Sequence, residues 1–404
     1  MIPYINYHKH SERSNLYTID SPVHLRDYCI RAKELGHTVI STVEHGWVGD
    51  VFEANRLAAE YDLKFIVGAE FYFVKDRKSE DKTNAHIIVM AMTENGREAV
   101  NDIQSEANLT GFYYKPRVDL ELLLSLPEDE VVVTTACIGG IWKYDDYDDI
   151  IKTLHQKFGR HLYLEVQPHN NEKQAELNRR ILGLHKKYDI DLIAGTDSHY
   201  IYPEQSQLRN DLIETKGIHY DDEDNWYMDF CDGDELYRRF ANQAVLSHDE
   251  IMAAISNTLI FENVETYNCP IFNDEIKLPT LYPELSQEQR NAEYKKIVMD
   301  GWDKYKLSVP ENEWFKYEEE IAKEIQTVID TNMADYFIID YETMKKGKKL
   351  GGKLTKSGRG SGASFFTNTL LGFSDVDRIS APVHMYPERF MSTTRILQSK
   401  GIPD

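Results

Sequence analysis

The chain has 404 residues, more than a single hydrophobic core usually serves, so at least two domains are expected. With 41% hydrophobic and 28% charged residues, the composition is that of a folded globular protein and excludes wholesale disorder. The sequence has no apolar run of the roughly 18 residues that a membrane helix needs and no N-terminal signal peptide, so we expect a cytoplasmic protein without a membrane partner.

The net charge of −22 argues against a surface that binds nucleic acid everywhere, since phosphate contacts need local positive charge. From residue 341 to the end, however, eleven Lys and Arg residues stand against five Asp and Glu residues. A basic surface is therefore expected in the C-terminal part. The four cysteines have no paired spacing, which excludes a CxxC zinc site and makes a disulfide framework an unfavoured interpretation.

Seven short apolar runs in the first 200 residues predict strands. They read IPYINYH, HTVISTVE, LKFIVGAE, HIIVMAM, EVVVTTA, LYLEVQ and DLIAGTD. Amphipathic segments such as 49–61 and 171–188 lie between them and predict helices. Repeated strand–helix units favour a parallel sheet, and a closed or nearly closed barrel is the economical arrangement.

The pattern changes after Tyr200, where strand-like runs stop. Helices are predicted at 241–257, 287–306, 313–331 and 365–371. A proline-bearing stretch follows Cys269 and separates the first of these helices from the others. We therefore expect one domain over residues 1–265 and a second, smaller one over residues 266–404.

Residues with metal-binding side chains recur at the ends of the predicted strands. In a parallel barrel the loops after the strands form one face, so donors at these positions converge. His8 and His10 are two apart on an extended segment, which points both imidazoles to the same side. The donors at strand ends are His8, His10, Glu44, His45, Glu70, Cys137, Asp197 and His199.

His86 begins its apolar run instead of ending it, so either that strand starts earlier or the barrel register differs there. Taken singly, each donor is more often a hydrogen-bonded or core residue than a ligand. Their coincidence favours bound cations, because carboxylates brought together would otherwise repel one another and take up protons. Eight or nine N, O and S donors exceed the needs of one four-coordinate ion, so two or three zinc, manganese or iron ions are expected.

Neighbouring divalent ions serve hydrolysis by lowering the pKa of a bridging water and by binding both oxygens of an in-line displacement at phosphorus. The donor set therefore predicts phosphoester hydrolysis. Histidine and carboxylate side chains of the cluster would orient the attacking hydroxide, and Asp197 and His199 are the catalytic candidates among them.

The motifs around these donors resemble those of the polymerase-and-histidinol-phosphatase (PHP) domain. They are His8-Lys9-His10-Ser11, Glu44-His45-Gly46, Gly68-Ala69-Glu70, His86, Ala136-Cys137 and Asp197-Ser198-His199-Tyr200. The run 111–117, GFYYKPR, is similar to a signature of the PHP domain in bacterial replicative DNA polymerase III alpha subunits, the C family. The resemblance implies an α/β fold with a distorted seven-stranded barrel. It also implies nine metal ligands, at His8, His10, an early acid, His45, Glu70, His86, Cys137, Asp197 and His199.

Two positions depart from the family pattern. The early acid usually lies seven residues after the second histidine, but position 17 is Tyr, so Asp20 is the expected substitute and Glu12 the rival. The usual Asp-His-Gly reads Glu44-His45-Gly46, which keeps the charge on a longer arm. Some members of the family have lost ligands and with them hydrolytic activity, whereas this chain keeps nearly all of the ligand positions.

A glycine-rich loop at 357–364 joins a basic run to the predicted helix at 365–371. Glycines let the backbone approach an anion, a helix N-terminus favours negative charge, and Arg359 adds a fork of donors, so a triphosphate is a natural guest. Taken alone, such a loop is more often a flexible linker with solvated lysines. The lysines are Lys345, Lys346, Lys348, Lys349, Lys353 and Lys356.

The surroundings of this loop resemble the first half of the C-family palm. Matching segments are 334–339, 370–377, 387–390 and Pro403-Asp404. The resemblance implies a smaller, incomplete α+β palm domain that binds nucleotide phosphates. The residues it assigns to this are Gly358, Arg359, Gly360, Ser361 and Ser364, with Arg389 and Arg395 as supporting cations.

Asp404 matches the first catalytic carboxylate of the family, and the sequence stops there. Two-metal nucleotidyl transfer needs at least two carboxylates to hold magnesium, so Mg²⁺ is expected at the palm only when it is completed, and polymerisation by this chain alone is not expected. Either a truncation or a split gene, whose second polypeptide supplies the remaining acids, would explain the end.

The leading interpretation is the N-terminal part of a C-family replicative polymerase whose PHP site is a metal-dependent phosphoesterase, expected to act as a 3′–5′ exonuclease. Its partners would be DNA, deoxynucleoside triphosphate and a completing polypeptide. The alternative is a non-catalytic scaffold in which metals brace the fold and the surface holds the other polymerase half or a proofreading partner. The palm-like half disfavours a free-standing small-molecule phosphatase, and drift from the bacterial motifs suggests a phage or plasmid source.

Overall fold

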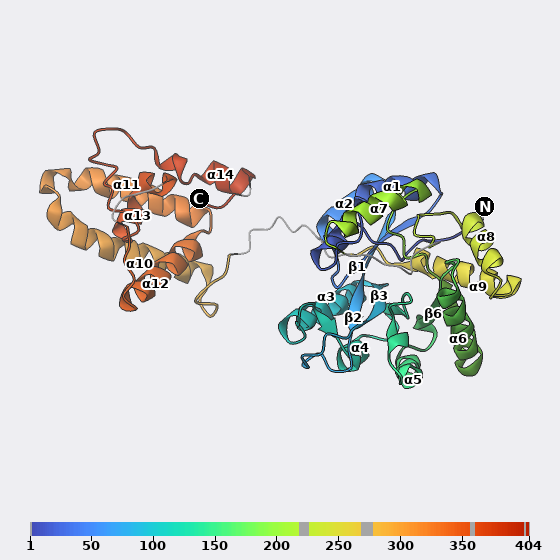
Figure 1. Ribbon diagram of the computed structural model, residues 1–404. Helices are drawn as coiled ribbons and strands as arrows, with labels where there is room; N and C mark the ends of the chain where they lie inside the picture. The colour runs from blue at the N-terminus through green and yellow to red at the C-terminus, as the bar shows by residue number, and fades with distance from the viewer. Residues whose placement is uncertain (1, 218–225, 268–277, 356–359, 400, 404) are drawn as a thin grey trace. The chain divides into compact units, whose positions relative to one another are not determined.

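The computed structural model describes residues 2–217, 226–267, 278–355, 360–399 and 401–403. The chain forms two compact units, Met1–Phe272 and Asn273–Asp404, which are coloured blue to yellow and orange to red in Figure 1. The division falls a few residues beyond the 265/266 boundary expected from the sequence. Each unit has a hydrophobic core of its own.

Unit 1 is built on a seven-stranded sheet. Its strands are β1 (Val39–His45), β2 (Lys64–Phe73), β3 (Ala85–Ala91), β4 (Arg117–Val118), β5 (Val131–Thr134), β6 (Leu162–Val166) and β7 (Leu192–Ala194). They are ordered β1-β2-β3-β5-β6-β7, with β4 paired to the end of β2. The α/β class is confirmed, and six of the seven predicted runs form strands. The short strand β4, which lies in the GFYYKPR region, was not predicted.

Strand β3 runs antiparallel to both of its neighbours, β2 and β5, whereas the other pairs are parallel. The prediction of a parallel sheet is therefore wrong at β3. The chain between β2 and β3 contains no helix, so it reverses direction instead of crossing over the sheet. The start of β3 consequently lies at the same edge as the ends of the parallel strands. This direction explains the position of His86, which pairs with Tyr72 near the end of β2.

The first predicted strand, residues 2–8, forms no regular strand. The Ile5 N–H donates to the side-chain Oγ1 of Thr258 at 3.1 Å. In a regular strand this backbone N–H would donate to a carbonyl oxygen of the neighbouring strand. Further along, the His10 N–H donates to Ser198 O at 2.8 Å, close to the end of β7. This segment is thereby held beside the chain that leaves β7, where it takes the place of a regular barrel strand.

The central strands are buried on both faces. Along β3, Ile87 and Val89 pack into one apolar cluster, whereas Ile88 and Met90 pack into another. Strands covered on both faces need apolar side chains at nearly every position, which is the pattern that the sequence shows. The core therefore holds the sheet rigidly and fixes the positions of the residues at its edge.

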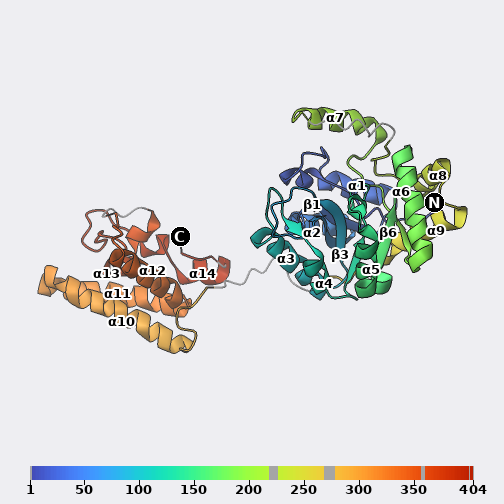
Figure 2. The ribbon, with the colours of Figure 1, turned by 60° about the horizontal axis from the view of Figure 1, so that its bottom comes forward.

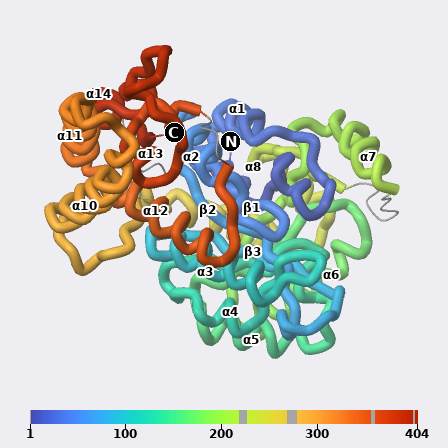
Figure 3. The backbone as a smooth tube through the Cα atoms, turned by 90° about the vertical axis from the view of Figure 1, so that its left-hand side faces the viewer, coloured from blue at the N-terminus to red at the C-terminus, as the bar shows by residue number. Residues whose placement is uncertain are grey.

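Helices cover the outside of this sheet (Figure 1). Their bounds are α1 (Leu25–Glu34), α2 (Val51–Glu60), α3 (Glu94–Leu109), α4 (Leu120–Ser125), α5 (Tyr147–Phe158), α6 (Glu172–Tyr188), α7 (Ser206–Glu214), α8 (Gly233–Gln243) and α9 (His248–Asn257). Helices α3, α4 and α5 follow one another along one side of the unit (Figure 3). Side chains cap several of them: Asp50 accepts the Glu53 N–H before α2, and Asn171 accepts the Gln174 N–H before α6.

The regular secondary structure in the described residues of unit 2 is helical. The helices are α10 (Gln287–Tyr305), α11 (Trp314–Asp330), α12 (Ala334–Lys349), α13 (Phe366–Leu370) and α14 (Thr393–Ser399). The predicted helices at 287–306, 313–331 and 365–371 are confirmed, but the strands of an α+β palm are absent from residues 278–355, 360–399 and 401–403. Apolar residues of these helices pack into one cluster, so helix packing instead of a sheet buries them. None of the helices in the described ranges is long and apolar enough to span a bilayer.

Candidate metal centre

Nine side chains singled out in the sequence meet at one edge of the unit 1 sheet. They are His8, His10, Asp20, His45, Glu70, His86, Cys137, Asp197 and His199, and the structure describes all nine. His45, the last residue of β1, pairs with Glu70 of β2 across the sheet. His86 enters at the start of β3, and the remaining residues follow β5 and β7 or lie on the N-terminal segment.

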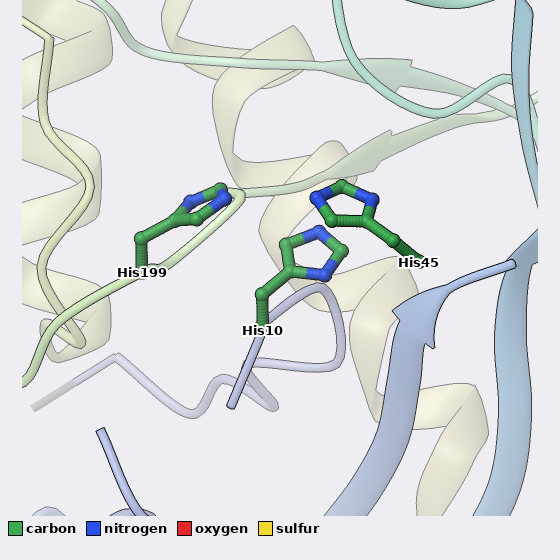
Figure 4. A group of neighbouring side chains, drawn as sticks. All are labelled: His10, His45 and His199. Atoms are coloured by element: carbon green, nitrogen blue, oxygen red, sulfur yellow. The ribbon is translucent and has the colours of Figure 1, made fainter. Parts of the chain in front are cut away.

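Three histidines form one compact group of nitrogen donors. Figure 4 shows the rings of His10, His45 and His199 close together, each carried by a different segment. The ring centroid of His10 lies 3.9 Å from that of His45 and 4.8 Å from that of His199. Burial and the neighbouring His45 lower the pKa of His10 to about 4, so its imidazole is neutral near pH 7. A neutral imidazole is the form that binds a metal ion.

Asp197 lies between two histidines of the N-terminal segment. Its Oδ1 is 3.3 Å from His8 Nε2 and 3.1 Å from His10 Nε2. Asp197 has a φ of 48° and Ala136, which precedes Cys137, a φ of 55°. Left-handed backbone costs a non-glycine residue of the order of 1 kcal/mol, and such residues cluster at functional sites. Both turns aim a donor side chain at the sheet edge.

Glu70 forms the other side of the cluster. Its carboxylate lies 2.6 Å from His45 Nδ1 and 3.0 Å from His86 Nδ1. Cys137 Sγ is 3.5 Å from His86 Nδ1 and 3.7 Å from Glu70 Oε1. Burial and the Glu70 charge raise the pKa of the Cys137 thiol well above its usual range. A thiolate ligand at this position therefore requires a cation beside it.

Several donor atoms at the centre of the cluster face one another without a well-directed hydrogen bond. They are His8 Nε2, His10 Nε2, His45 Nδ1, Glu70 Oε2 and Asp197 Oδ1, all buried. A buried polar atom without a hydrogen bond costs up to about 1–3 kcal/mol, so five poorly bonded atoms in one volume need a common explanation. Imidazole nitrogens and carboxylate oxygens are donors that zinc, manganese and iron accept, and bound ions would satisfy all five atoms. The residues present fit a multinuclear metal site.

Asp20, and not its rival Glu12, lies at the cluster. Asp20 Oδ2 is 2.9 Å from His199 Nε2. Its other oxygen is bonded to Arg209 of α7, the helix that Figure 2 shows at the outer edge of unit 1. Although burial raises the pKa of Asp20, His199 and Arg209 hold it well below the usual range. Glu12 instead accepts the Leu25 N–H at 3.1 Å, at the start of α1.

Sequence comparisons agree with this geometry. Residues 6–169 match the model of the PHP domain, and residues 291–400 match the model of the bacterial DNA polymerase III alpha NTPase domain. The chain thus contains a region that matches the PHP domain, followed by a region that matches part of the bacterial DNA polymerase III alpha subunit. Unit 1 contains the whole segment matched to the PHP domain, and unit 2 contains the segment matched to the polymerase.

Curated relatives carry both parts. The DNA polymerase III subunit alpha of Aquifex aeolicus is 27% identical over 97% of this chain and 35% of its own length. The DNA-directed DNA polymerase of Bacillus phage SPbeta is 24% identical over 92% of this chain and 34% of its own length. The chain thus spans about a third of the length of the curated relatives it matches.

Two solved structures are similar to about half of the chain. A putative metal-dependent phosphoesterase from Bifidobacterium adolescentis is 16% identical, with a TM-score of 0.32, over 49% of this chain and 89% of its own. Histidinol phosphate phosphatase from Lactococcus lactis is 15% identical, with a TM-score of 0.26, over 54% of this chain and 94% of its own. Superpositions with such TM-scores establish no residue-level correspondence.

Glu44 of the PHP domain, expected among the strand-end donors, does not face the cluster. Successive side chains of a strand point to opposite faces, so Glu44 and His45 of β1 diverge. The Glu44 carboxylate accepts the hydroxyls of Ser11 and Ser14, both at 2.6 Å. Glu44 therefore holds the chain that follows His10, and its role is structural.

Glu165, the last but one residue of β6, was not predicted from the sequence. Its Oε1 lies 2.6 Å from His8 Nδ1, and its Oε2 accepts the Tyr7 hydroxyl at 2.6 Å and the Thr134 hydroxyl at 3.0 Å. Gly195 leaves room for this carboxylate, since a Cβ there would lie 2.1 Å from Glu165 Oε1. The sequence offered one signal for Glu165, since it is the only acid in a mostly apolar predicted strand. A buried carboxylate needs hydrogen-bond partners, so such a residue points to a polar site.

The nucleotide-phosphate candidates of the polymerase part are described only in part. Gly358, Arg359 and Asp404 lie outside the described residues. Gly360 has a φ of 73° and precedes a 3-10 turn in which the Ser364 hydroxyl donates to Ser361 O at 2.7 Å. Arg389 is exposed, and Arg395 donates to its carbonyl oxygen at 3.3 Å. Phosphate binding by these residues stays a prediction.

Proposed function

We propose that the PHP domain is a metal-dependent phosphoesterase that removes nucleotides from the 3′ end of DNA. The observation that carries the proposal is the convergence of five buried donor atoms, none with a well-directed hydrogen bond, on one volume at the sheet edge. The nine side chains would hold two or three zinc, manganese or iron ions. Such ions supply a hydroxide nucleophile at neutral pH and bind the phosphate oxygens. The relatives named DNA polymerases support DNA as the substrate.

The two catalytic candidates, Asp197 and His199, are held in defined orientations. His199 Nδ1 lies 2.7 Å from the Asp197 carbonyl oxygen and, as the N–H, donates to it. That bond leaves Nε2 as the ring nitrogen that faces the cluster, 2.9 Å from Asp20 Oδ2. Asp197 Oδ1 faces both His8 and His10 and has no hydrogen bond of its own. These two residues would place the nucleophile and the phosphate relative to each other.

We further propose that the polymerase part binds nucleotide phosphates through its glycine-rich loop. The residues are Gly358, Arg359, Gly360, Ser361 and Ser364, with Arg389 and Arg395 in support. Asp404 would contribute one carboxylate for Mg²⁺, and a second polypeptide or a further region of the chain would contribute the others. Its partners would be DNA, deoxynucleoside triphosphate and that completing part, in the cytoplasm where replication takes place.

One observation favours the alternative of a non-catalytic, metal-braced scaffold for a polymerase half or a proofreading partner. The cluster is deeply buried: His8, His10 and Glu70 have no exposed surface, and His86 is 19% exposed at its side chain. A site that substrate cannot reach would stabilise the fold without turnover. The two functions differ in whether the metal-loaded protein cleaves any phosphate ester.

The first experiment is metal analysis followed by digestion of single-stranded DNA with Mn²⁺ or Zn²⁺. We expect the wild-type protein to retain at least two ions and to release nucleotides from the 3′ end. His10→Ala and Asp197→Ala should lose metal and activity together, whereas His24→Ala, at an exposed histidine of the same unit, should keep both. Full metal occupancy without turnover of DNA or of small phosphate esters would favour the scaffold.

A further inference from the structure

A lysine lies beside the metal cluster, separated from it by one aromatic ring. Lys115 Nζ is 4.1 Å from the centroid of the Tyr72 ring. The Tyr72 ring centroid is in turn 5.6 Å from that of His86 and 6.4 Å from that of His45. Within the described residues, the recorded partners of the Lys115 ammonium are this ring and the Thr18 hydroxyl, at 3.2 Å. A phosphate at the cluster would therefore meet a cation at its edge.

The loop that carries Lys115 is held firmly in place. Arg117 donates to the carbonyl oxygens of Arg77, Ser79 and Asp81, each at 2.7 Å, and to that of Gly111 at 2.9 Å. The Arg117 side chain is buried. Three of these bonds tie the loop to the chain before β3, and the fourth, to Gly111, links the two ends of the loop. Groups fixed in this way lose little further freedom when a ligand binds.

The same loop exposes two aromatic rings. Phe112 is 55% exposed and Tyr114 is 66% exposed. Tyr114 has a φ of 62°, a backbone conformation that side chains other than glycine rarely adopt. Lys82 Nζ lies 4.2 Å from the centroid of the Tyr114 ring. The loop therefore presents aromatic rings and ammonium groups together. Tyr114 keeps its ring although glycine would suit the backbone at that position better.

We propose that Phe112, Tyr114 and Lys115 dock a single-stranded nucleic acid beside the PHP metal cluster. Aromatic rings stack on unpaired bases of any sequence, while lysines neutralise the phosphates between them. Lys115 pairs with the phosphate nearest the cluster, and Lys82 pairs with one further along the strand. A small phosphate ester offers no row of bases to stack. The inference rests on the proposed phosphoesterase function, but docking is measurable without catalysis.

The test is fluorescence anisotropy of the metal-loaded full chain with a 5′-labelled oligothymidylate that has phosphorothioate linkages. Tyr114→Gly removes the ring and suits the left-handed backbone, so its fold is preserved and its affinity should fall about tenfold. Phe112→Ala should weaken binding to a similar degree. Phe52→Ala, at a 50% exposed aromatic residue of α2, is the matched control and should bind as the wild type does.

The salt dependence tests the role of Lys115. Lys115→Gln should lower the slope of log Kd against log salt concentration by about 0.7, the value for one phosphate contact on a single strand, and Lys115→Arg should restore it. Lys186→Gln, at an exposed lysine of α6 that pairs with Glu250, should leave the slope unchanged. A slope that is the same in Lys115→Gln as in the wild type contradicts the phosphate contact.

The docking proposal and the phosphoesterase proposal fail in different ways. Unchanged oligothymidylate affinity in both Tyr114→Gly and Phe112→Ala overturns docking, whatever the catalytic result. In a hydrolysis assay, the loss in Tyr114→Gly should be larger for DNA than for bis(p-nitrophenyl) phosphate, and equal losses would also overturn docking. A wild-type protein that binds the strand through these residues but cleaves neither substrate overturns the phosphoesterase function and leaves docking intact.

Discussion

His8 Nδ1 lies 2.6 Å from Glu165 Oε1, and both side chains are fully buried. Glu165 as a carboxylate accepts this N–H, which leaves Nε2, 3.3 Å from Asp197 Oδ1, as the nitrogen of His8 that would bind an ion. A ligand histidine whose second nitrogen is bonded to a carboxylate keeps one tautomer and one ring orientation. Glu165 is therefore a positioning residue for the metal cluster, although it does not itself face it.

Glu165→Gln should weaken metal binding by about 10- to 100-fold, because the amide no longer fixes the His8 tautomer. Competition with a chromogenic chelator measures the change in affinity. Glu172→Gln, at a 71% exposed side chain, is the control and should bind metal as the wild type does. Gly195→Ala should resemble Glu165→Gln, since its Cβ would displace the Glu165 carboxylate. Unchanged affinity in both variants would exclude a positioning role.

Metal affinity should rise with pH across the neutral range. Although burial lowers it, Glu70 and Asp20 raise the pKa of His45 to about 10 in the metal-free protein. The proton on His45 must leave before the ring can bind an ion, so binding below pH 10 releases it, and affinity rises up to about tenfold per pH unit for that proton. Titration calorimetry in two buffers of different ionisation enthalpy counts the released protons, and a count of zero contradicts this assignment.

The same pKa shift affects the stability of the metal-free protein with the opposite sign. A histidine whose folded pKa is raised contributes stability that is complete below its unfolded value of about 6.5. That contribution is lost as the pH rises from about 6.5 to the folded pKa of about 10. Thermal melts of the chelated protein should therefore show the contribution of His45 fading over this range, and His45→Gln should remove that pH dependence.

Most of the cluster could be predicted because donors followed apolar runs, but three features depended on the tertiary structure. The place of His86 depends on the direction of β3, which a short helix-free connection decides and an apolar run does not reveal. The choice of Asp20 over Glu12 depends on Arg209, which is 189 residues away in the sequence. Glu165 lies inside a strand, so the strand-end pattern could not find it.

The polymerase part shows a different limit. Its helices were predicted from apolar spacing, whereas the expected α+β class came from family resemblance and not from any strand-like run. In the described ranges of unit 2, Trp302, Phe337 and Phe366 pack between helices and no strand forms. In the described ranges of unit 2, the spacing of apolar residues therefore predicted the helices correctly, whereas the strands implied by the family resemblance do not occur there.

A buried ion pair in unit 2 should be essential to its stability. Glu324 of α11 accepts the N–H groups of Phe366 and Thr367, at 2.9 and 2.7 Å, and that of Arg378 Nε at 2.8 Å. Glu324→Ala leaves a buried guanidinium and the start of α13 without their acceptor, so it should cost about 3–5 kcal/mol. Differential scanning calorimetry measures the loss. Glu319→Ala, at a 55% exposed surface pair, should change stability by less than about 0.5 kcal/mol.

Cys137 should be the only described cysteine that contacts a bound metal. Its Sγ lies 3.5 Å from His86 Nδ1, whereas Cys231 is buried in the apolar core and burial raises the pKa of its thiol to about 12. A bound cation stabilises the thiolate of Cys137 but has no route to that of Cys231. The Co²⁺-loaded protein should therefore show thiolate-to-metal charge-transfer absorption that Cys137→Ser abolishes and Cys231→Ser retains. Absorption that survives in Cys137→Ser would place the thiolate elsewhere and remove Cys137 from the ligand set.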